Sequence, residues 1–342
     1  MVSINDVAAH AGVSPTTVSH ALSGNRKVSD RVRDRVRAAM AELGYVPSRS
    51  AQNLARGNTR IIGLVIPDIS NGFFAELAKG VEQSAMDEGY NVILCTTGFD
   101  HAREVLYLEM IRSRAVDGIV YAAGSPPSNS ELAALLGDIP LVLVDEEIPG
   151  ADATAFVSDN THGGELAAEH LLGLGHRSCV ILAANDQLVS SAQRVDGFLT
   201  AWAQGGGEPP RIASGGFTET GGQAAIRPFI DFRGERPFSA VFAVNDLMAI
   251  GAIDALEVAG LTVPTDVSVM GFDDIAPGRY STPSLTTVRQ DVSALGSSAA
   301  RSLVGALEGR SPLDGSRHVL PVQLIARNST APHGSVTTEG AH

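Results

Sequence analysis

Apolar residues recur at helical spacing in three short stretches near the start of the chain. Residues 4–11 and residues 15–22 each place their apolar side chains on one face, and residues 29–43 repeat the pattern over a longer span. Only a tight turn of about two residues fits between the first two stretches. The pattern therefore predicts two short helices joined by a tight turn, followed by a third amphipathic helix.

Start and stop signals frame these helices. Ser3 and Asp6 have the S-x-x-D spacing of a capping box, and Ser14 can cap the second helix. Gly12 and Gly44 can adopt the left-handed conformation that ends a helix. Because both the periodicity and the caps agree, we interpret the stretch as a helix–turn–helix, while an ordinary helical hairpin of a globular domain is the alternative.

Beyond residue 60, short apolar runs rich in β-branched residues alternate with amphipathic stretches. The predicted strands are 61–66, 91–95, 117–122, 140–144, 179–183, 239–244 and 267–272. The predicted helices lie near 73–88, 101–114, 162–174, 191–204, 221–231, 246–259 and 293–308. This alternation is typical of parallel sheets covered by helices on both faces, and its length favours two lobes over one.

Composition and pattern together divide the chain into four parts. Residues 1–46 form an all-α helix–turn–helix headpiece, and residues 47–59 are a polar linker that could become helical only against a partner. Residues 60–330 form an α/β domain of two doubly wound parallel-sheet lobes, and residues 331–342 are expected to be a disordered tail. Polar residues such as Asp145 and Asp273 follow predicted strands, where such sheets bind ligands.

The charge of the chain is divided unequally. The whole chain carries 25 basic and 38 acidic residues, a net charge of −13. Residues 1–60 hold nine basic and four acidic residues, a net of +5, so the remaining 16 basic and 34 acidic residues give −18. A basic headpiece on an acidic body suits a headpiece that binds phosphate groups and a body that does not.

The sequence gives little support for a metal-binding protein, a membrane protein or an enzyme. The two cysteines, Cys95 and Cys179, lie in apolar runs, so we expect buried free thiols and no metal site. The apolar runs are too short to cross a membrane, and we expect a cytoplasmic protein. The motifs of serine hydrolases, P-loop enzymes and zinc proteases are absent from the sequence, so we expect neither catalysis nor a cofactor.

Motifs over nearly the whole chain resemble one family. The most specific are DVAAHAGVSPTTVSHALSG, VSDRVRDRVRAAMAELGYVPSRSAQNLARG, IGLVIPDISNGFFAEL, AVFAVNDLMAIGA and VPTDVSVMGFDDI. In this order they are similar to the LacI (lactose repressor) family of bacterial transcription regulators. The resemblance implies a repressor that binds a pseudo-palindromic double-stranded DNA operator as a homodimer and responds to a small-molecule effector. The alternative is a free-standing sugar-binding protein without a DNA role.

The resemblance also implies which residues contact DNA. The matching positions are Ser14, Pro15, Thr16, Thr17, Ser19, His20, Asn25, Arg49, Leu54 and Ala55. Leu54 matches the apolar side chain that wedges into the minor groove and kinks the duplex. Many relatives have Arg where this chain has His20, and a histidine cannot make the bidentate guanine contact of an arginine. The operator is therefore expected to differ from the commonest one of the family.

For the effector cleft, the matching positions are Phe73, Asp145, Arg194, Phe217, Asn245 and Asp273. Aromatic faces with carboxylate, amide and guanidinium groups suit a sugar-like ligand. Glu146 stands where purine-binding members have an aromatic residue, which favours a sugar over a purine. Two simpler interpretations stay open: Asp273 could cap a helix, and one of the adjacent Phe73 and Phe74 rings is expected to belong to the core.

Overall fold

The computed structural model forms two compact units, residues 1–61 with 115–117 and the rest of the chain. It describes residues 2–23, 28–45, 58–112, 116–184, 188–230 and 238–334. The predicted linker lies almost wholly outside the described residues, as does most of the predicted tail.

Three helices make up the headpiece, as the sequence predicts: α1 (Ile4–Ala11), α2 (Pro15–Ser23) and α3 (Asp30–Leu43). The capping box of α1 is present, because the Ser3 side chain accepts from the Asp6 amide while the Asp6 carboxylate accepts from the Ser3 amide. Gly12 ends α1 with a φ of 62°. The three helices bury one core around Val7, Val18 and Val36.

Arg35 holds the turn between α1 and α2, a role that the sequence pattern does not reveal. Its guanidinium lies on α3 and donates to the carbonyl oxygens of Ala11 at 2.7 Å and Gly12 at 3.1 Å. These carbonyls belong to the end of α1, where helix carbonyls lack partners and the helix dipole favours a cation. Arg35 therefore fixes the angle between the two helices of the motif.

Arg35→Ala is expected to destabilise the headpiece by about 1 kcal/mol, because the two carbonyls lose a charged donor. Amide hydrogen exchange of α1 in the full chain should become about fivefold faster. Arg37→Ala, an exposed arginine on the same helix, is the control and should leave exchange unchanged. Equal exchange rates in the two variants would contradict this role of Arg35.

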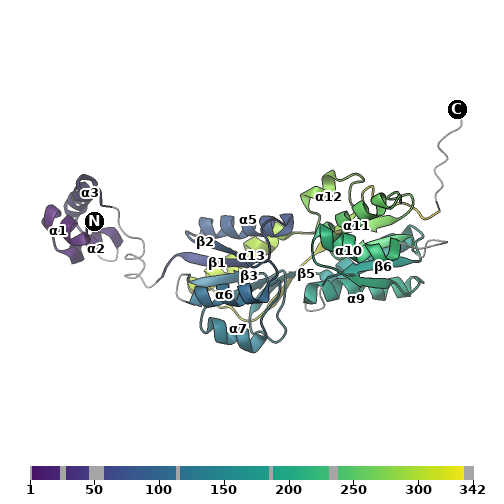
Figure 1. Cartoon of the computed structure of the whole chain (residues 1–342). Helices are drawn as coiled ribbons and strands as arrows, with labels where there is room; N and C mark the ends of the chain where they lie inside the picture. Colours follow the sequence, from purple (N-terminus) through teal and green to yellow (C-terminus); the bar gives the residue numbers. More distant parts are fainter. Residues whose placement is uncertain are drawn as a thin grey trace. The chain divides into compact units, whose positions relative to one another are not determined.

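The amino-terminal lobe of the body is built on a six-stranded sheet in the order β11-β5-β4-β3-β1-β2. Its strands are β1 (Ile61–Ile66), β2 (Asn91–Thr96), β3 (Gly118–Tyr121), β4 (Leu141–Val144), β5 (Thr154–Ser158) and β11 (Arg317–Leu320). Its helices are α5 (Gly72–Asp87), α6 (His101–Arg112), α7 (Asn129–Leu136) and α13 (Val292–Leu307). Helices α5 and α13 pack together on one face of the sheet, and α6 and α7 lie on the other (Figure 1).

The carboxy-terminal lobe has a four-stranded parallel sheet in the order β7-β6-β8-β9. Its strands are β6 (Cys179–Ala183), β7 (Arg211–Ser214), β8 (Ala240–Ala243) and β9 (Ser268–Met270). Its helices are α8 (Asn160–Gly173), α9 (Val189–Gln204), α10 (Glu219–Ile230), α11 (Asp246–Val258) and α12 (Ala276–Tyr280). The prediction of two lobes with parallel sheets is confirmed, and each lobe has its own apolar core.

Two further strands, β10 (Thr287–Gln290) and β12 (Val322–Ile325), pair antiparallel where the chain crosses between the lobes. Strand β10 leads directly into α13 of the amino-terminal lobe, and β12 follows β11 across Pro321. The chain crosses a third time between β5 and α8. Any movement of one lobe against the other would therefore bend all three crossing segments.

The structure also bears on the expectations for the two cysteines and the carboxy-terminal tail. Cys95 and Cys179 are buried free thiols, as predicted. Within the predicted tail, the Ala331 carbonyl lies 3.2 Å from His176 Nε2 and the His333 amide donates to the Leu174 carbonyl, so residues 331–334 lie against the carboxy-terminal lobe. Among the described residues, no helix is both long and apolar enough to span a membrane.

Candidate functional site

The six cleft residues expected from the resemblance lie together around one cavity between the lobes. Phe73 comes from α5, Asp145 follows β4, and Arg194 lies on α9. Phe217 lies in the loop before α10, while Asn245 and Asp273 follow β8 and β9. Because parallel strands end at the same edge of a sheet, residues far apart in sequence meet there.

Arg194 is the central cation of the cleft, and only 4% of its surface is exposed. Its Nε donates to Asn160 Oδ1 at 2.8 Å and one terminal nitrogen donates to the Val244 carbonyl at 2.8 Å. The guanidinium carbon lies 4.0 Å from the centre of the Phe272 ring, a cation–π contact. These contacts hold the guanidinium in one orientation, with a terminal nitrogen 3.6 Å from Asp273 Oδ1.

A close contact between α8 and α9 sets the position of Arg194. A Cβ on Gly164 of α8 would lie 2.1 Å from the Arg194 carbonyl oxygen, and one on Gly197 of α9 would lie 2.0 Å from the Thr161 carbonyl oxygen. Both distances are shorter than any side chain tolerates, so only glycine lets the two helices approach this far. Gly164 and Gly197 therefore set how closely α8 and α9 pack, and with it the position of Arg194 in the cleft.

Asp273 and Asp145 face this guanidinium from opposite lobes. Burial raises the pKa of Asp273 to about 7 although Arg194 counteracts the rise, and burial likewise raises the pKa of Asp145 to about 6. Asp273 accepts from Gln290 Nε2 at 2.7 Å and does not cap a helix, so that alternative is wrong. Both residues have positive φ, 67° at Asp145 and 120° at Asp273, a strain that clusters at ligand sites.

The Asn245 side chain makes two hydrogen bonds that fix the cavity wall. Its Oδ1 accepts from the Met248 amide at 2.9 Å and caps α11, while its Nδ2 donates to the Phe217 carbonyl at 3.3 Å. The cap fixes the amide in the cavity wall, and the second bond fixes the loop that carries the Phe217 ring. A ligand hydroxyl would therefore meet an amide held in one orientation.

Aromatic rings form the rest of the cavity wall. Phe73 and Phe74 are both buried in the core of the amino-terminal lobe, in edge-to-face contact at 5.1 Å, and both line the cavity. The expectation that the two rings would be divided between core and cavity is therefore wrong. Phe99, which sequence reasoning missed, stacks on Phe217 of the other lobe with ring centres 5.9 Å apart. Phe99 follows a turn without any motif, so no signal in the sequence singles it out.

Glu146 joins the two lobes directly. Its Oε1 accepts from the Val189 amide at 2.6 Å and the Ser190 amide at 3.2 Å, and its Oε2 accepts from the Ser190 hydroxyl at 2.5 Å. The carboxyl group comes from the end of β4, whereas the donors are the first turn of α9 in the other lobe. The sequence marks Glu146 only as a departure from relatives, not as an interlobe contact.

The cavity between the lobes has a volume of only about 30 Å³, room for a few water molecules. A sugar needs more room than this, so binding a sugar would require the wall of the cavity to move. The cleft is thus closed in this structure, and its contacts between lobes are the ones that a ligand would replace.

The headpiece exposes the face of α2 that the resemblance assigns to DNA. Ser14, Pro15 and Thr16 are exposed, and Thr17, Ser19 and His20 are partly exposed. Ser14 Oγ accepts from the Thr17 amide at 3.1 Å, which confirms the predicted cap, and its hydroxyl lies 2.8 Å from that of Thr17. The other four predicted DNA contacts, Asn25, Arg49, Leu54 and Ala55, lie outside the described residues.

His176 and the possible metal ligands offer no second reactive site among the described residues. His176, one of the histidines in the sequence, is buried between the hydroxyls of Ser239 and Ser268, and burial lowers its pKa to about 4. It is therefore a neutral core residue. In the part of the chain that the structure describes, histidine, cysteine and acidic side chains form no group of three that could hold a metal ion.

A three-helix headpiece with an exposed second helix and a two-lobed body with a polar cleft define the class of ligand-responsive DNA-binding regulators. Residues 3–48 match the bacterial regulatory proteins of the lacI family, and residues 168–330 match a periplasmic binding protein-like domain. The chain belongs to the LacI family, and it is a DNA-binding transcriptional regulator with a small-molecule-binding body.

Full-length relatives support this assignment. The transcriptional regulator DegA of Bacillus subtilis is 34% identical over 96% of this chain and 98% of its own length. The lac repressor dimer bound to operator and the anti-inducer ONPF superimposes with a TM-score of 0.83 at 27% identity, covering 96% and 99% of the two chains. A LacI-family regulator of Enterococcus faecalis with bound ribose gives a TM-score of 0.71 at 33% identity, covering 80% and 99%.

Proposed function

We propose that this protein is a repressor that binds a pseudo-palindromic operator as a homodimer and releases or tightens it in response to a neutral, sugar-like effector. Residues 1–46 are the DNA-binding part, residues 47–59 the hinge, and residues 60–330 the effector-binding and dimerisation part. The observation that carries the proposal is the closed, polar cleft around Arg194 in a chain that begins with a basic helix–turn–helix. Because such a repressor acts on the bacterial chromosome, the proposal includes a cytoplasmic location.

The chemistry of the cleft supports a neutral effector. Asp145, Glu146 and Asp273 line the same cavity as a single guanidinium, so an anionic ligand would meet more negative than positive groups. Carboxyl groups with pKa values of about 6 to 7 can both donate to and accept from hydroxyls near neutral pH. The Phe73 and Phe217 rings supply apolar faces for a sugar ring. Bound ribose in a structural relative agrees with this chemistry.

Exposed apolar side chains support the homodimer. Met86 at the end of α5 and Ile93 and Leu94 on the edge strand β2 are exposed on the amino-terminal lobe, and Ile212 is exposed on the edge strand β7 of the other lobe. An uncovered edge strand with apolar side chains is a site of association. The relative bound to operator is a dimer, and two-fold symmetry matches a pseudo-palindrome.

The test is operator selection with the full chain, followed by titration. A random DNA library should yield a pseudo-palindromic site, and one neutral sugar of a panel should change operator affinity at least about tenfold, measured by fluorescence anisotropy. The panel includes purines and sugar phosphates as controls. Failure to enrich any DNA sequence would contradict the DNA role, and a response to purines alone would contradict the sugar.

A further inference from the structure

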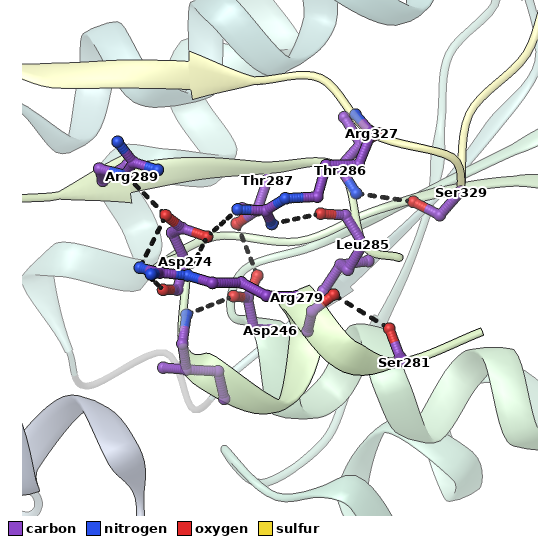
Figure 2. Close-up of polar contacts among 12 residues, drawn as sticks. Asp246, Asp274, Arg279, Ser281, Leu285, Thr286, Thr287, Arg289, Arg327 and Ser329 are labelled. Carbon is purple, nitrogen blue, oxygen red and sulfur yellow. Dashed lines mark hydrogen bonds and ion pairs between the residues drawn. The ribbon is translucent and has the colours of Figure 1, made fainter. Parts of the chain in front are cut away.

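Asp274, next to Asp273 of the cleft, is held by three arginines. Its carboxylate is fully buried and accepts from Arg289 Nε at 2.6 Å, from an Arg279 terminal nitrogen at 3.1 Å and from Arg327 (Figure 2). The four residues come from the loop after β9, from α12, from β10 and from the segment after β12. Figure 2 shows the guanidinium groups converging on this one carboxylate from different segments.

This cluster has an excess of positive charge. Three guanidinium groups share one carboxylate, which lowers the pKa of Asp274 below its ordinary value through the Arg327 and Arg289 contacts despite the opposing effect of burial. Arg327 also donates to the Leu285 carbonyl and is largely buried. Arg279 and Arg289 are 48% and 44% exposed, so their surplus charge faces solvent.

The two exposed arginines line a groove of about 800 Å³ that both lobes form. Its lining includes Phe73 and Glu76 of α5, Arg279 of α12 and residues of the crossover strands β10 and β12. Two further acids line the groove: Asp291 caps α13, and Asp273 accepts from Gln290. Glu76 is an exposed carboxylate of the groove wall.

Among the described residues, two side chains of the groove have hydrogen-bonding atoms without a partner: Arg289 and Gln290. Arg289 uses only its Nε, so both terminal nitrogens are available as a fork of donors. Gln290, next along β10, is 4% exposed, and its Oε1 has no hydrogen-bond partner. A buried acceptor without a donor is costly, so a ligand hydroxyl that donates to Gln290 Oε1 would be favoured.

We propose that this groove is a second ligand site, for a small organic phosphate that also carries a hydroxyl group. Arg289 binds the phosphate oxygens through its two terminal nitrogens, since a guanidinium fork matches phosphate geometry. Arg279 adds its one remaining terminal nitrogen, because its Nε and the other terminal nitrogen donate to Asp274. The hydroxyl donates to Gln290 Oε1. Phe73 and Asp273 line both the groove and the cleft around Arg194, so the two sites adjoin.

The groove is linked to the cleft by a chain of contacts. Gln290 Nε2 donates to Asp273 at 2.7 Å, and Asp273 lies 3.6 Å from a terminal nitrogen of Arg194. Because residues of both lobes line the groove, its width depends on the angle between the lobes, and a ligand there favours one lobe arrangement. Occupation of either site therefore changes affinity at the other by the same factor.

The test is calorimetric titration of the full chain with glycerol 3-phosphate at constant ionic strength, with glycerol and inorganic phosphate as comparison ligands. Wild-type protein should bind glycerol 3-phosphate more tightly than inorganic phosphate, and glycerol should not bind. Arg289→Gln and Arg279→Gln should each weaken binding about tenfold, and Arg289→Lys should weaken it less because the charge remains. Arg301→Gln, an exposed arginine of α13, is the matched control.

Thermal unfolding of each variant verifies that the Asp274 cluster still folds. Equal affinity of wild-type and Arg289→Gln proteins for glycerol 3-phosphate would overturn the site. Equal binding of inorganic phosphate and glycerol 3-phosphate by wild-type protein would overturn the role of Gln290. Displacement of glycerol 3-phosphate by a saturating neutral sugar would place it in the effector cleft and would also overturn the proposal. A failure of these tests leaves the operator and sugar results unaffected.

Discussion

Arg194→Met is expected to abolish the effector response and to lower the free energy of unfolding of the body by about 3–5 kcal/mol. The substitution leaves Asn160 Oδ1, the Val244 carbonyl and Asp273 without their charged donor inside a buried cleft. Unpaired buried polar groups cost far more than the loss of an exposed contact. A methionine is long enough to fill much of the volume, so the loss reports the charge and its hydrogen bonds.

Urea unfolding can be followed through Trp202, the single tryptophan of the chain. Trp202 is fully buried on α9, the helix that carries Arg194, and it stacks on Phe198. Operator affinity with and without the sugar gives the second measurement. Arg227→Met, an exposed arginine of α10 in the same lobe, should change stability by less than about 0.5 kcal/mol.

Retention of operator binding separates the two units in this experiment. The headpiece of Arg194→Met is unchanged, so the variant should still bind operator while ignoring the sugar. A variant that responds to the sugar at the wild-type concentration would contradict the assignment of Arg194 to the effector site. Loss of operator binding together with the response would indicate instead that the cleft residue is needed for the folded body.

The headpiece is predictable because its signals are local. The capping box of Ser3 and Asp6, the left-handed Gly12 and the apolar stripes are all read within a few residues, and each appears in the structure. Arg35 is the exception. Its partners at Ala11 and Gly12 are 24 and 23 positions away, and a row of arginines on a helix looks the same whether the side chains are free or clamped.

In the body, strands such as β1 and β6 are predicted because they are buried on both faces and read as continuous apolar runs. The prediction omits β5, β7 and β11, although β5 is buried along its whole length. Strands β10 and β12 escape because they are four residues long and mix charged or amide residues with apolar ones. Their pairing is also distant in sequence. Helix α12 has only five residues, too few for any periodicity to appear.

The candidate site likewise contains residues that the sequence predicts and residues that only the structure reveals. Its six expected residues are found through the resemblance to the LacI family, and three of them, Asp145, Asn245 and Asp273, follow strands. Phe99 and Glu146 act through partners in the opposite lobe, and their contacts depend on how the lobes meet. Likewise, Asp274 and Arg327 are 53 positions apart, so the arginine cluster exists only after the crossover strands are in place. Sequence motifs identify the walls of the cleft, whereas folding decides what closes it.

Glu146 makes the contact between lobes sensitive to pH. Burial raises the pKa of Glu146 from its ordinary value of 4.5 to about 7, although the Ser190 and Val189 contacts favour its charged form. The folded protein therefore keeps a proton on Glu146 at pH values where the unfolded chain has lost it. The stability contributed by this proton is present below about pH 4.5 and is lost as pH rises toward 7.

Glu146→Gln is expected to flatten this pH dependence while leaving the protein folded. The glutamine oxygen can still accept from the Val189 and Ser190 amides, but the side chain no longer titrates. The unfolding temperature of wild-type protein should fall between pH 5 and pH 7 more steeply than that of Glu146→Gln, by several degrees over the interval. Differential scanning fluorimetry of both proteins across this interval measures the difference.

Glu147→Gln is the matched control, because the neighbouring carboxylate is partly exposed and pairs with Arg317 within the amino-terminal lobe. Its unfolding temperature should follow the wild-type pH profile, since Asp145, Glu146 and Asp273 still titrate. Glu146→Ala removes the interlobe acceptor altogether and should open the cleft, so that the sugar associates faster but is held less tightly. Identical pH profiles for wild-type and Glu146→Gln proteins would show that the contact between β4 and α9 is not where the lobes sense protons.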